Sequence, residues 1–172
     1  LEFAARGKNL IIVARRLDKL EGLKSAIQNI NPDLDVIIRT SDLSVRDQVY
    51  TLYNSLKEYQ IETWINNAGI GESSSVTDQN LDKVETMLHL NIESLTILST
   101  LFARDYYHIE GTQLINVSSA LGYAIYVGSI TYSASKYFVS AFTEGLAKEL
   151  EQKGAKMKVK ILAPAMTETE FA

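Results

Sequence analysis

Short apolar runs alternate along this chain with longer segments whose apolar residues recur every three or four positions. The runs lie at 9–14, 36–40, 61–66, 113–117 and 158–162, and the helical segments at 17–29, 44–59, 78–107 and 131–152. Near-continuous apolar strands that alternate with helices indicate a parallel sheet covered on both faces. Since crossovers between parallel strands are right-handed, the sequence predicts a doubly wound α/β fold in a single domain. Ser44 is the predicted N-cap of its helix.

The composition excludes several classes of protein. A length of 172 residues is enough for one domain with a substantial core, and a net charge of −4 without a basic block argues against nucleic acid as a partner. The chain has no cysteine, which excludes disulfides and thiolate chemistry and fits a cytoplasmic location. No apolar run approaches the roughly 20 residues of a membrane helix. His89 and His108 lack metal-ligand spacing, so we expect no metal site.

One cluster of polar residues carries the chemistry that the sequence suggests. Tyr132 and Lys136 are four positions apart, which places them on one face of a helix. Ser119 follows an apolar run, so its hydroxyl is expected at the carboxyl edge of a strand. A phenol, an ammonium and a hydroxyl together form a proton-transfer site for a carbonyl group. Ser118 competes with Ser119, but neighbouring side chains on a strand face opposite ways, and we choose Ser119.

A second tyrosine–lysine pair has the same spacing but a different context. Tyr53 and Lys57 lie in a segment with an ordinary amphipathic stripe, and no strand that ends in serine precedes them at a matching distance. We interpret this pair as structural.

Other polar or tightly turning residues also follow the predicted strands. Because parallel strands end at the same edge of a sheet, these residues are expected to converge where such sheets bind ligands. They are Arg15 and Arg16 after the first run, Asp42 and Leu43 after the second, Asn66-Asn67-Ala68-Gly69 after the third and Pro164 after the fifth.

The order of these motifs resembles the short-chain dehydrogenase/reductase family. Asn-Asn-Ala-Gly at 66–69 is followed by Asn91, then Ser119, then Tyr132 thirteen residues later and Lys136 four beyond. The resemblance implies an NAD(P)-dependent oxidoreductase that interconverts a carbonyl and an alcohol by hydride transfer, with a Rossmann-like fold over 1–172.

Site roles also follow from the resemblance. Tyr132 would be the general acid/base, Ser119 would orient the reacting oxygen, Lys136 would grip the nicotinamide ribose and Asn91 would hold a water that relays protons. The residues implied to bind the cofactor are Arg15, Arg16, Asp42, Leu43, Asn67, Ala68, Gly69, Tyr132, Lys136, Pro164 and Thr167, with Thr169 as an alternative to Thr167.

Two expectations about this site come from charge. A fixed ammonium close to a phenol favours the phenolate, so Lys136 is expected to lower the pKa of Tyr132. The second strand of such a fold usually ends in an acid when the enzyme selects NAD. The run at 9–14 corresponds to this second strand, and here Ala14 is followed by Arg15 and Arg16. Because a guanidinium pairs well with a 2′-phosphate, the sequence favours NADP(H) over NAD(H).

The sequence departs from the family pattern in two places. The family's Gly-rich motif is not found in this chain, and Gly69-Ile70-Gly71 does not replace it, so we expect the natural protein to extend beyond both ends. Without the strand that carries this motif, its two neighbours would have unpaired edges. Pro164-Ala165 stands where the family usually has Pro-Gly, and we expect only a modest local effect.

Substrate and partners stay open at this stage. Tyr123, Ile125 and Tyr126 lie between Ser119 and Tyr132, and their apolar character favours a bulky or acyl substrate over a sugar. The family resemblance implies a homodimer or homotetramer. The alternative function is a non-catalytic nucleotide-binding sensor or scaffold on the same fold, and a lyase or epimerase built on the same dyad is a third.

Overall fold

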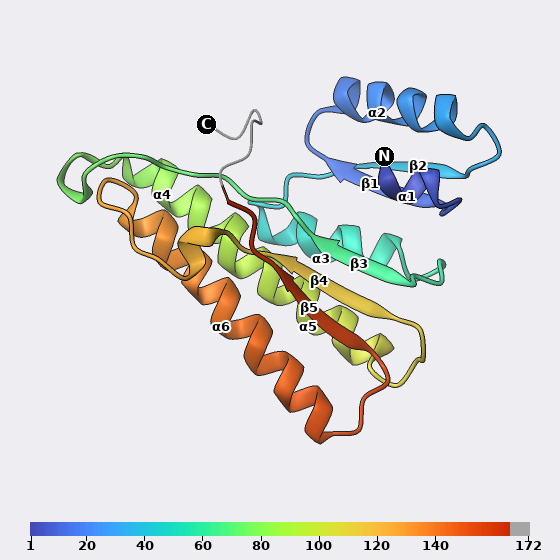
Figure 1. Cartoon of the computed structure of the whole chain (residues 1–172). Coiled ribbons are helices and arrows are strands. Elements are labelled where there is room, and N and C mark those ends of the chain that lie inside the picture. Colours follow the sequence, from blue (N-terminus) through green and yellow to red (C-terminus); the bar gives the residue numbers. More distant parts are fainter. Residues whose placement is uncertain (166–172) are drawn as a thin grey trace. The chain divides into compact units, whose positions relative to one another are not determined.

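The computed structural model describes residues 1–165, which form two compact units, 1–43 and 44–165 (Figure 1). Each unit has its own parallel sheet, with two strands in the first and three in the second. The parallel α/β fold class predicted from the alternation of strands and helices is confirmed. No helix within residues 1–165 combines the length and apolarity needed to cross a membrane.

The first unit is a small layer of helix on sheet. It consists of α1 (Glu2–Ala5), β1 (Leu10–Ala14), α2 (Leu17–Ile30) and β2 (Val36–Thr40). Its core contains Ala4, Ile27, Leu34 and Val36, with Leu10 and Ile12 packed against them. Because β1 pairs with β2 in parallel and Ala14 is opposite Thr40, the residues that follow these two strands start from neighbouring points on one edge.

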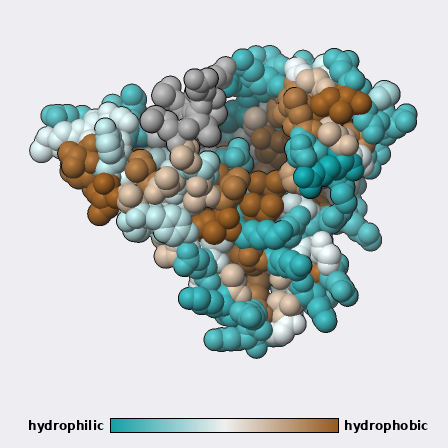
Figure 2. Space-filling model, in the orientation of Figure 1, coloured by the Kyte–Doolittle hydropathy of each residue, from teal (hydrophilic) through white to brown (hydrophobic). Residues whose placement is uncertain are grey.

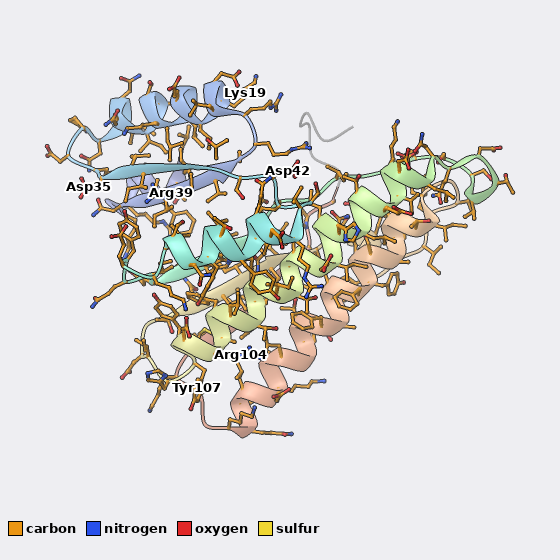
Figure 3. All side chains as sticks on the ribbon, turned by 180° about the vertical axis from the view of Figure 1, so that it is seen from behind. Lys19, Asp35, Arg39, Asp42, Arg104 and Tyr107 are labelled. Carbon is orange, nitrogen blue, oxygen red and sulfur yellow. The ribbon has the colours of Figure 1, made fainter. Side chains whose placement is uncertain are left out.

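The second unit contains the sheet β3–β4–β5 and the helices that cover one of its faces. Its strands are β3 (Thr63–Asn66), β4 (Gln113–Val117) and β5 (Lys158–Leu162), all parallel. Its helices are α3 (Arg46–Ser55), η1 (Val76–Asp78), α4 (Leu81–Leu88), the π-helix η2 (His89–Ser94), α5 (Leu95–Tyr106), η3 (Ala120–Gly122) and α6 (Ile130–Gln152). Figures 1 and 3 show α3, α5 and α6 together on one side of this sheet.

Alternation along β4 fixes which residues face these helices. Leu114 and Asn116 are fully buried, whereas Gln113, Ile115 and Val117 are partly exposed. The side chain of Asn116 accepts a hydrogen bond from Asn66 of β3 at 2.9 Å and donates one to Thr143 of α6 at 3.0 Å. A shift of one residue would turn this buried amide to the other face, so the network holds the register that places Ser118 and Ser119 after the strand.

One sequence expectation differs from the structure. Ser44 is not the helix N-cap, because α3 begins at Arg46 after Val45, and no side chain caps it. Leu43 and Ser44 belong to a turn that delays the helix.

Candidate active site

The end of β4 and the beginning of α6 bring Ser119 and Tyr132 together. Ser119 is the N-cap of η3, and its hydroxyl accepts a hydrogen bond from the backbone N–H of Leu121 at 3.2 Å. The Ser119 hydroxyl lies close enough to the Tyr132 phenol to lower its pKa. Two oxygen atoms that the sequence places thirteen residues apart therefore share one site, and a carbonyl oxygen could contact both.

Lys136 lies one turn further along α6 and is almost fully buried, with 4% of its surface exposed. Its Nζ donates to the carbonyl oxygen of Val117 at 3.1 Å and lies 5.8 Å from the centre of the Tyr132 ring. Burial lowers the pKa of Lys136 to about 8, because the charged ammonium loses hydration. The group therefore carries most of its charge at neutral pH and loses it just above.

The pKa of Tyr132 moves in the opposite direction to the one expected from charge. Burial raises it, and the hydrogen bond from Ser119 acts against this effect by lowering it. A low-dielectric environment disfavours a phenolate, and at this site desolvation is larger than the opposing effect of Ser119. In the absence of other charges, Tyr132 is therefore a protonated donor at neutral pH.

Asn91 lies in the π-helical turn and joins the loop after β3 to α6. Its Oδ1 accepts from the backbone N–H of Ile70 at 3.0 Å, and its Nδ2 donates to Ile70 O at 2.9 Å and to Ser135 Oγ at 3.1 Å. Ser135 in turn donates to the carbonyl oxygen of Tyr132 at 2.7 Å. Both amide protons of Asn91 are used, so its side chain acts as a structural link between the loop and the helix that carries Tyr132.

The loop after β3 approaches this group closely at Gly69. A Cβ atom at this position would lie 3.2 Å from Asn91 Oδ1 and 3.4 Å from Lys136 Nζ. Asn67 and Ala68 precede Gly69 in the same loop and are exposed. Gly69 therefore packs closely against both groups, and a side chain at this position would crowd the ammonium.

The segment after β5 reaches the same edge of the sheet. The backbone N–H of Ser118 donates to Leu162 O at 2.8 Å, and that of Ala120 donates to Pro164 O at 2.9 Å. Pro164 therefore lies beside the turn that carries Ser119. Thr167 and Thr169 lie outside the described residues.

The predicted cofactor residues of the first unit form a separate group. Arg15 and Arg16 follow β1 and are exposed, and Arg16 is the N-cap residue of α2. Asp42 and Leu43 follow β2, and Figure 3 shows Asp42 at the carboxyl end of this strand, with Asp35 at its beginning. Four of the predicted residues thus lie beyond the carboxyl ends of two paired strands.

The second tyrosine–lysine pair has a structural environment. Tyr53 is buried and donates a hydrogen bond to Asp105 at 2.7 Å, and burial raises its pKa. Its ring packs against Trp64 at 5.5 Å, whereas Lys57 is exposed and lies beyond the end of α3. These contacts agree with the interpretation of Tyr53 as a core residue.

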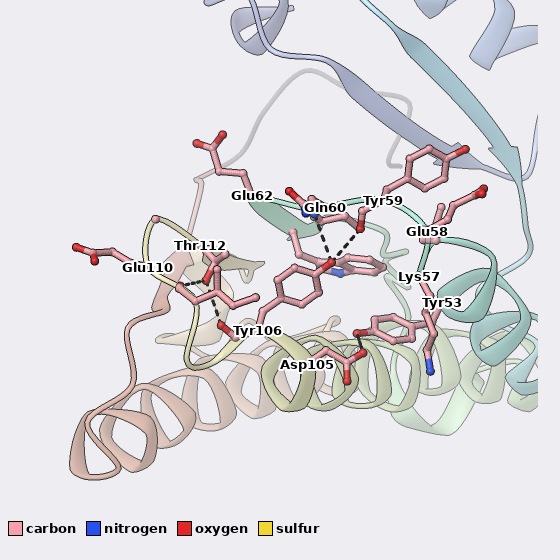
Figure 4. A pocket seen from close by; sticks show the side chains of 15 residues that line it. Tyr53, Lys57, Glu58, Tyr59, Gln60, Glu62, Asp105, Tyr106, Glu110 and Thr112 are labelled. Carbon is pink, nitrogen blue, oxygen red and sulfur yellow. Dashed lines mark hydrogen bonds between the residues drawn. The ribbon is translucent and has the colours of Figure 1, made fainter.

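A cavity of about 970 Å³ lies beside Tyr53, at the amino ends of β3 and β4 (Figure 4). Its walls come from the segments that precede these two strands, including Glu62 and Thr112. Ser119 and Tyr132 are at the other ends of the strands, so this cavity is not part of their site. Residues 1–165 contain no group of three or more His, Cys, Asp or Glu side chains that could hold a metal ion.

The sequence does not single out three buried serines that are hydrogen-bonded to residues of the site, Ser118, Ser135 and Ser140. Serine in an apolar or helical segment carries no distinctive pattern. The π-helical turn was also missed, because the apolar periodicity of 78–107 does not reveal which carbonyl each N–H contacts.

The burial of Lys136 predicts a pH dependence of stability without cofactor. Its pKa is near 10.5 in the unfolded chain and about 8 in the fold, so between these values the unfolded chain binds more protons. The free energy of unfolding should therefore rise with pH in this window, by up to about 3 kcal/mol from this group. Urea unfolding at several pH values should show this rise for the wild type and a flatter profile for Lys136→Met. Equal slopes for the two proteins would contradict the burial of the ammonium.

Comparison with known proteins places this geometry in a family. The family model described as short chain dehydrogenase matches residues 1–172. A sulfoacetaldehyde reductase of Chromohalobacter salexigens is 34% identical over 98% of this chain and 66% of its own length. The chain thus spans about two thirds of the length of this relative.

Solved structures show the same likeness in three dimensions. A short-chain dehydrogenase from Sphingobium yanoikuyae in complex with NADPH has a TM-score of 0.90 at 30% identity, covering 99% of this chain and 66% of that one. A bulky-bulky ketone specific alcohol dehydrogenase from Comamonas testosteroni has a TM-score of 0.90 at 28% identity, covering 99% and 68%. On the match of this family model over its whole length, the chain belongs to the short-chain dehydrogenase family.

Proposed function

We propose that this protein is an oxidoreductase that interconverts a carbonyl and an alcohol, with Tyr132 as the general acid/base. The observation that carries the proposal is the proximity of three groups: the Ser119 hydroxyl acts on the pKa of Tyr132, and Lys136 Nζ lies 5.8 Å from the centre of the tyrosine ring. Two donors directed at one oxygen stabilise the charge that develops there during reduction. Membership of a dehydrogenase family supports this reading over that of a non-catalytic nucleotide-binding protein.

Each residue has a defined part in the proposed reaction. Tyr132 donates its proton to the substrate oxygen during reduction and accepts a proton from the alcohol in the reverse direction. Ser119 hydrogen-bonds the same oxygen and orients it. Since burial raises the pKa of Tyr132, its protonated form is available at neutral pH, and this state favours reduction over oxidation.

The residues around Lys136 fit a nicotinamide dinucleotide, which supplies or accepts the hydride when bound. An ammonium has three protons, and the bond to Val117 O uses one of them, so Lys136 can also bind ribose hydroxyls. Gly69 places no side chain beside this ammonium. We propose that Asn67, Ala68, Gly69 and Pro164 line this part of the site, and that Asp42 and Leu43 contact the adenine end.

Asn91 has a positioning role in this proposal. Its amide protons hold Ile70 and Ser135, so a relay water would have to bind its main-chain carbonyl or the remaining lone pair of Oδ1. Through Ser135, this side chain also fixes the carbonyl of Tyr132.

We further propose a preference for NADP(H) over NAD(H). Arg15 and Arg16 follow β1 as exposed residues, where a guanidinium can pair with a 2′-phosphate in a charge-assisted, bidentate contact. The NADPH complex of a structurally similar dehydrogenase supports this choice.

The cofactor preference predicts a selective effect of Arg15→Ala. Loss of a charge-assisted contact should lower kcat/KM for NADPH by about tenfold or more, while the value for NADH changes by less than about twofold. Lys8→Ala is the matched control, because it removes a cation at the opposite end of β1. Steady-state kinetics with both cofactors would refute the assignment if Arg15→Ala affected NADPH and NADH equally.

The loop before α6 supports a bulky substrate. Ile125, Tyr126 and Val127 are 74%, 63% and 86% exposed, and Figure 2 shows hydrophobic surface at the end of the second unit where this loop lies. The hydroxyl of Tyr123 donates to Glu144 of α6 at 3.0 Å, which anchors the start of the loop. The name of the similar Comamonas testosteroni enzyme, specific for bulky-bulky ketones, supports the same substrate class.

This proposal is tested with NADPH and a panel of carbonyl compounds. We expect kcat/KM for ketones with two bulky groups to exceed that for acetone by at least about tenfold, since each buried methylene adds to binding. Ile125→Ser should reduce this advantage, whereas Ile109→Ser, at another exposed isoleucine at the other end of the unit, should not. Cofactor binding without turnover of any compound would favour the sensor or scaffold instead.

A further inference from the structure

Ser118 is adjacent to the proposed catalytic Ser119 but faces the interior of the second unit. Only 3% of its surface is exposed, and its hydroxyl donates to the carbonyl oxygen of Lys136 at 3.0 Å. Ser118 Oγ also lies 2.9 Å from the hydroxyl oxygen of Ser140, which is equally buried. Ser118 therefore connects the end of β4 directly to the turn of α6 that carries Lys136.

The direction of these hydrogen bonds follows from the number of protons. Ser118 has one hydroxyl proton, and it is used in the bond to Lys136 O. Ser140 must then donate to Ser118, which gives the order Ser140, Ser118, Lys136 O. A helical serine commonly donates to the carbonyl four residues earlier, which for Ser140 is that of Lys136. Here Ser118 donates to Lys136 O in place of Ser140.

Gly122 closes over the two hydroxyls from the turn that begins at Ser119. A Cβ atom at this position would overlap Ser118 Oγ, and it would lie 2.6 Å from Ser140 Oγ and 2.8 Å from Lys136 O. The third contact is with backbone, so the neighbours cannot simply rotate away. The turn η3 can pack this closely on α6 only because residue 122 has no side chain.

We propose that the Ser118–Ser140 hydroxyl pair, closed over by Gly122, is a positioning device that fixes Ser119 relative to Tyr132 and Lys136. This inference rests on the proposed carbonyl–alcohol chemistry. The two ends of Lys136 are held by consecutive residues of one strand end, since its Nζ binds Val117 O and its main-chain oxygen binds Ser118. Ser119 comes next in the chain, so the two residues that hold Lys136 also fix the position of the Ser119 hydroxyl.

Loss of the Ser118 or the Ser140 hydroxyl should let Ser119 shift relative to Tyr132 and Lys136. Ser118→Ala should lower kcat by about tenfold, because small displacements of a reacting group are costly, while KM for NADPH changes by less than about twofold. Ser140→Ala should have a similar effect. The double variant should be little worse than either single variant, since both substitutions break one network. Gly122→Ala should be the most damaging.

A second readout does not depend on turnover. The Ser119 bond lowers the pKa of Tyr132, so a displaced Ser119 should let that pKa rise. Carbon NMR of ring-labelled tyrosine, with the Tyr132 signal assigned through Tyr132→Phe, should show an upward shift in Ser118→Ala and Ser140→Ala, smaller than in Ser119→Ala. This measurement applies even if the proposed function fails in the carbonyl panel.

Thr112→Val is the matched control. Thr112 is a buried hydroxyl residue at the opposite end of β4 and donates to a main-chain carbonyl, that of Ile109, at 2.7 Å. Its loss should reduce stability but leave kcat and the Tyr132 pKa unchanged. The proposal is overturned if Ser118→Ala and Ser140→Ala behave like Thr112→Val, with lower stability and no change in the Tyr132 titration.

Discussion

The candidate site depends on one buried cation and on the two backbone contacts that hold it. Lys136 has almost no exposed surface, yet its ammonium is bound to Val117 O and its own carbonyl is bound by Ser118. An isolated buried charge would be costly, and its pKa falls to about 8 as a result. The other residues of the site are arranged around this point, with Tyr132 one turn before it on α6.

Hydrogen bonds also connect the helical segments before and after β4 to this site. Asn91 extends from the π-helical turn to Ile70 and Ser135, and Ser135 contacts the carbonyl of Tyr132. Gly69 lies beside both Asn91 and the ammonium. A loop, a strand end and two helical segments therefore meet at a single polar cluster, which gives a proton donor a fixed position.

Much of this fold could be predicted from the sequence because its strands are short, nearly continuous apolar runs. The strands at 36–40, 113–117 and 158–162 were predicted with the boundaries that the structure has. The order of Asn91, Ser119, Tyr132 and Lys136 indicated the family. The start of α3 was wrong, since a serine before a helical stripe does not show where a turn ends.

Contacts between distant residues could not be predicted in this way. Ser118 was considered only as a rival of Ser119, because its partner Ser140 lies on another element and has no pattern of its own. The upward shift of the Tyr132 pKa was also missed, since the sequence shows the charge of Lys136 but not the burial of the phenol. Desolvation depends on packing, which a single sequence does not reveal.

The most direct test of the central claim separates cofactor binding from hydride transfer in Tyr132→Phe. Fluorescence titration gives the affinity for NADPH, and stopped-flow single-turnover reduction of a ketone gives the rate of the chemical step. If Tyr132 supplies the proton, the variant should bind NADPH within a few-fold of the wild type and transfer hydride at least about 100-fold more slowly. A single-turnover rate equal to that of the wild type would contradict the account.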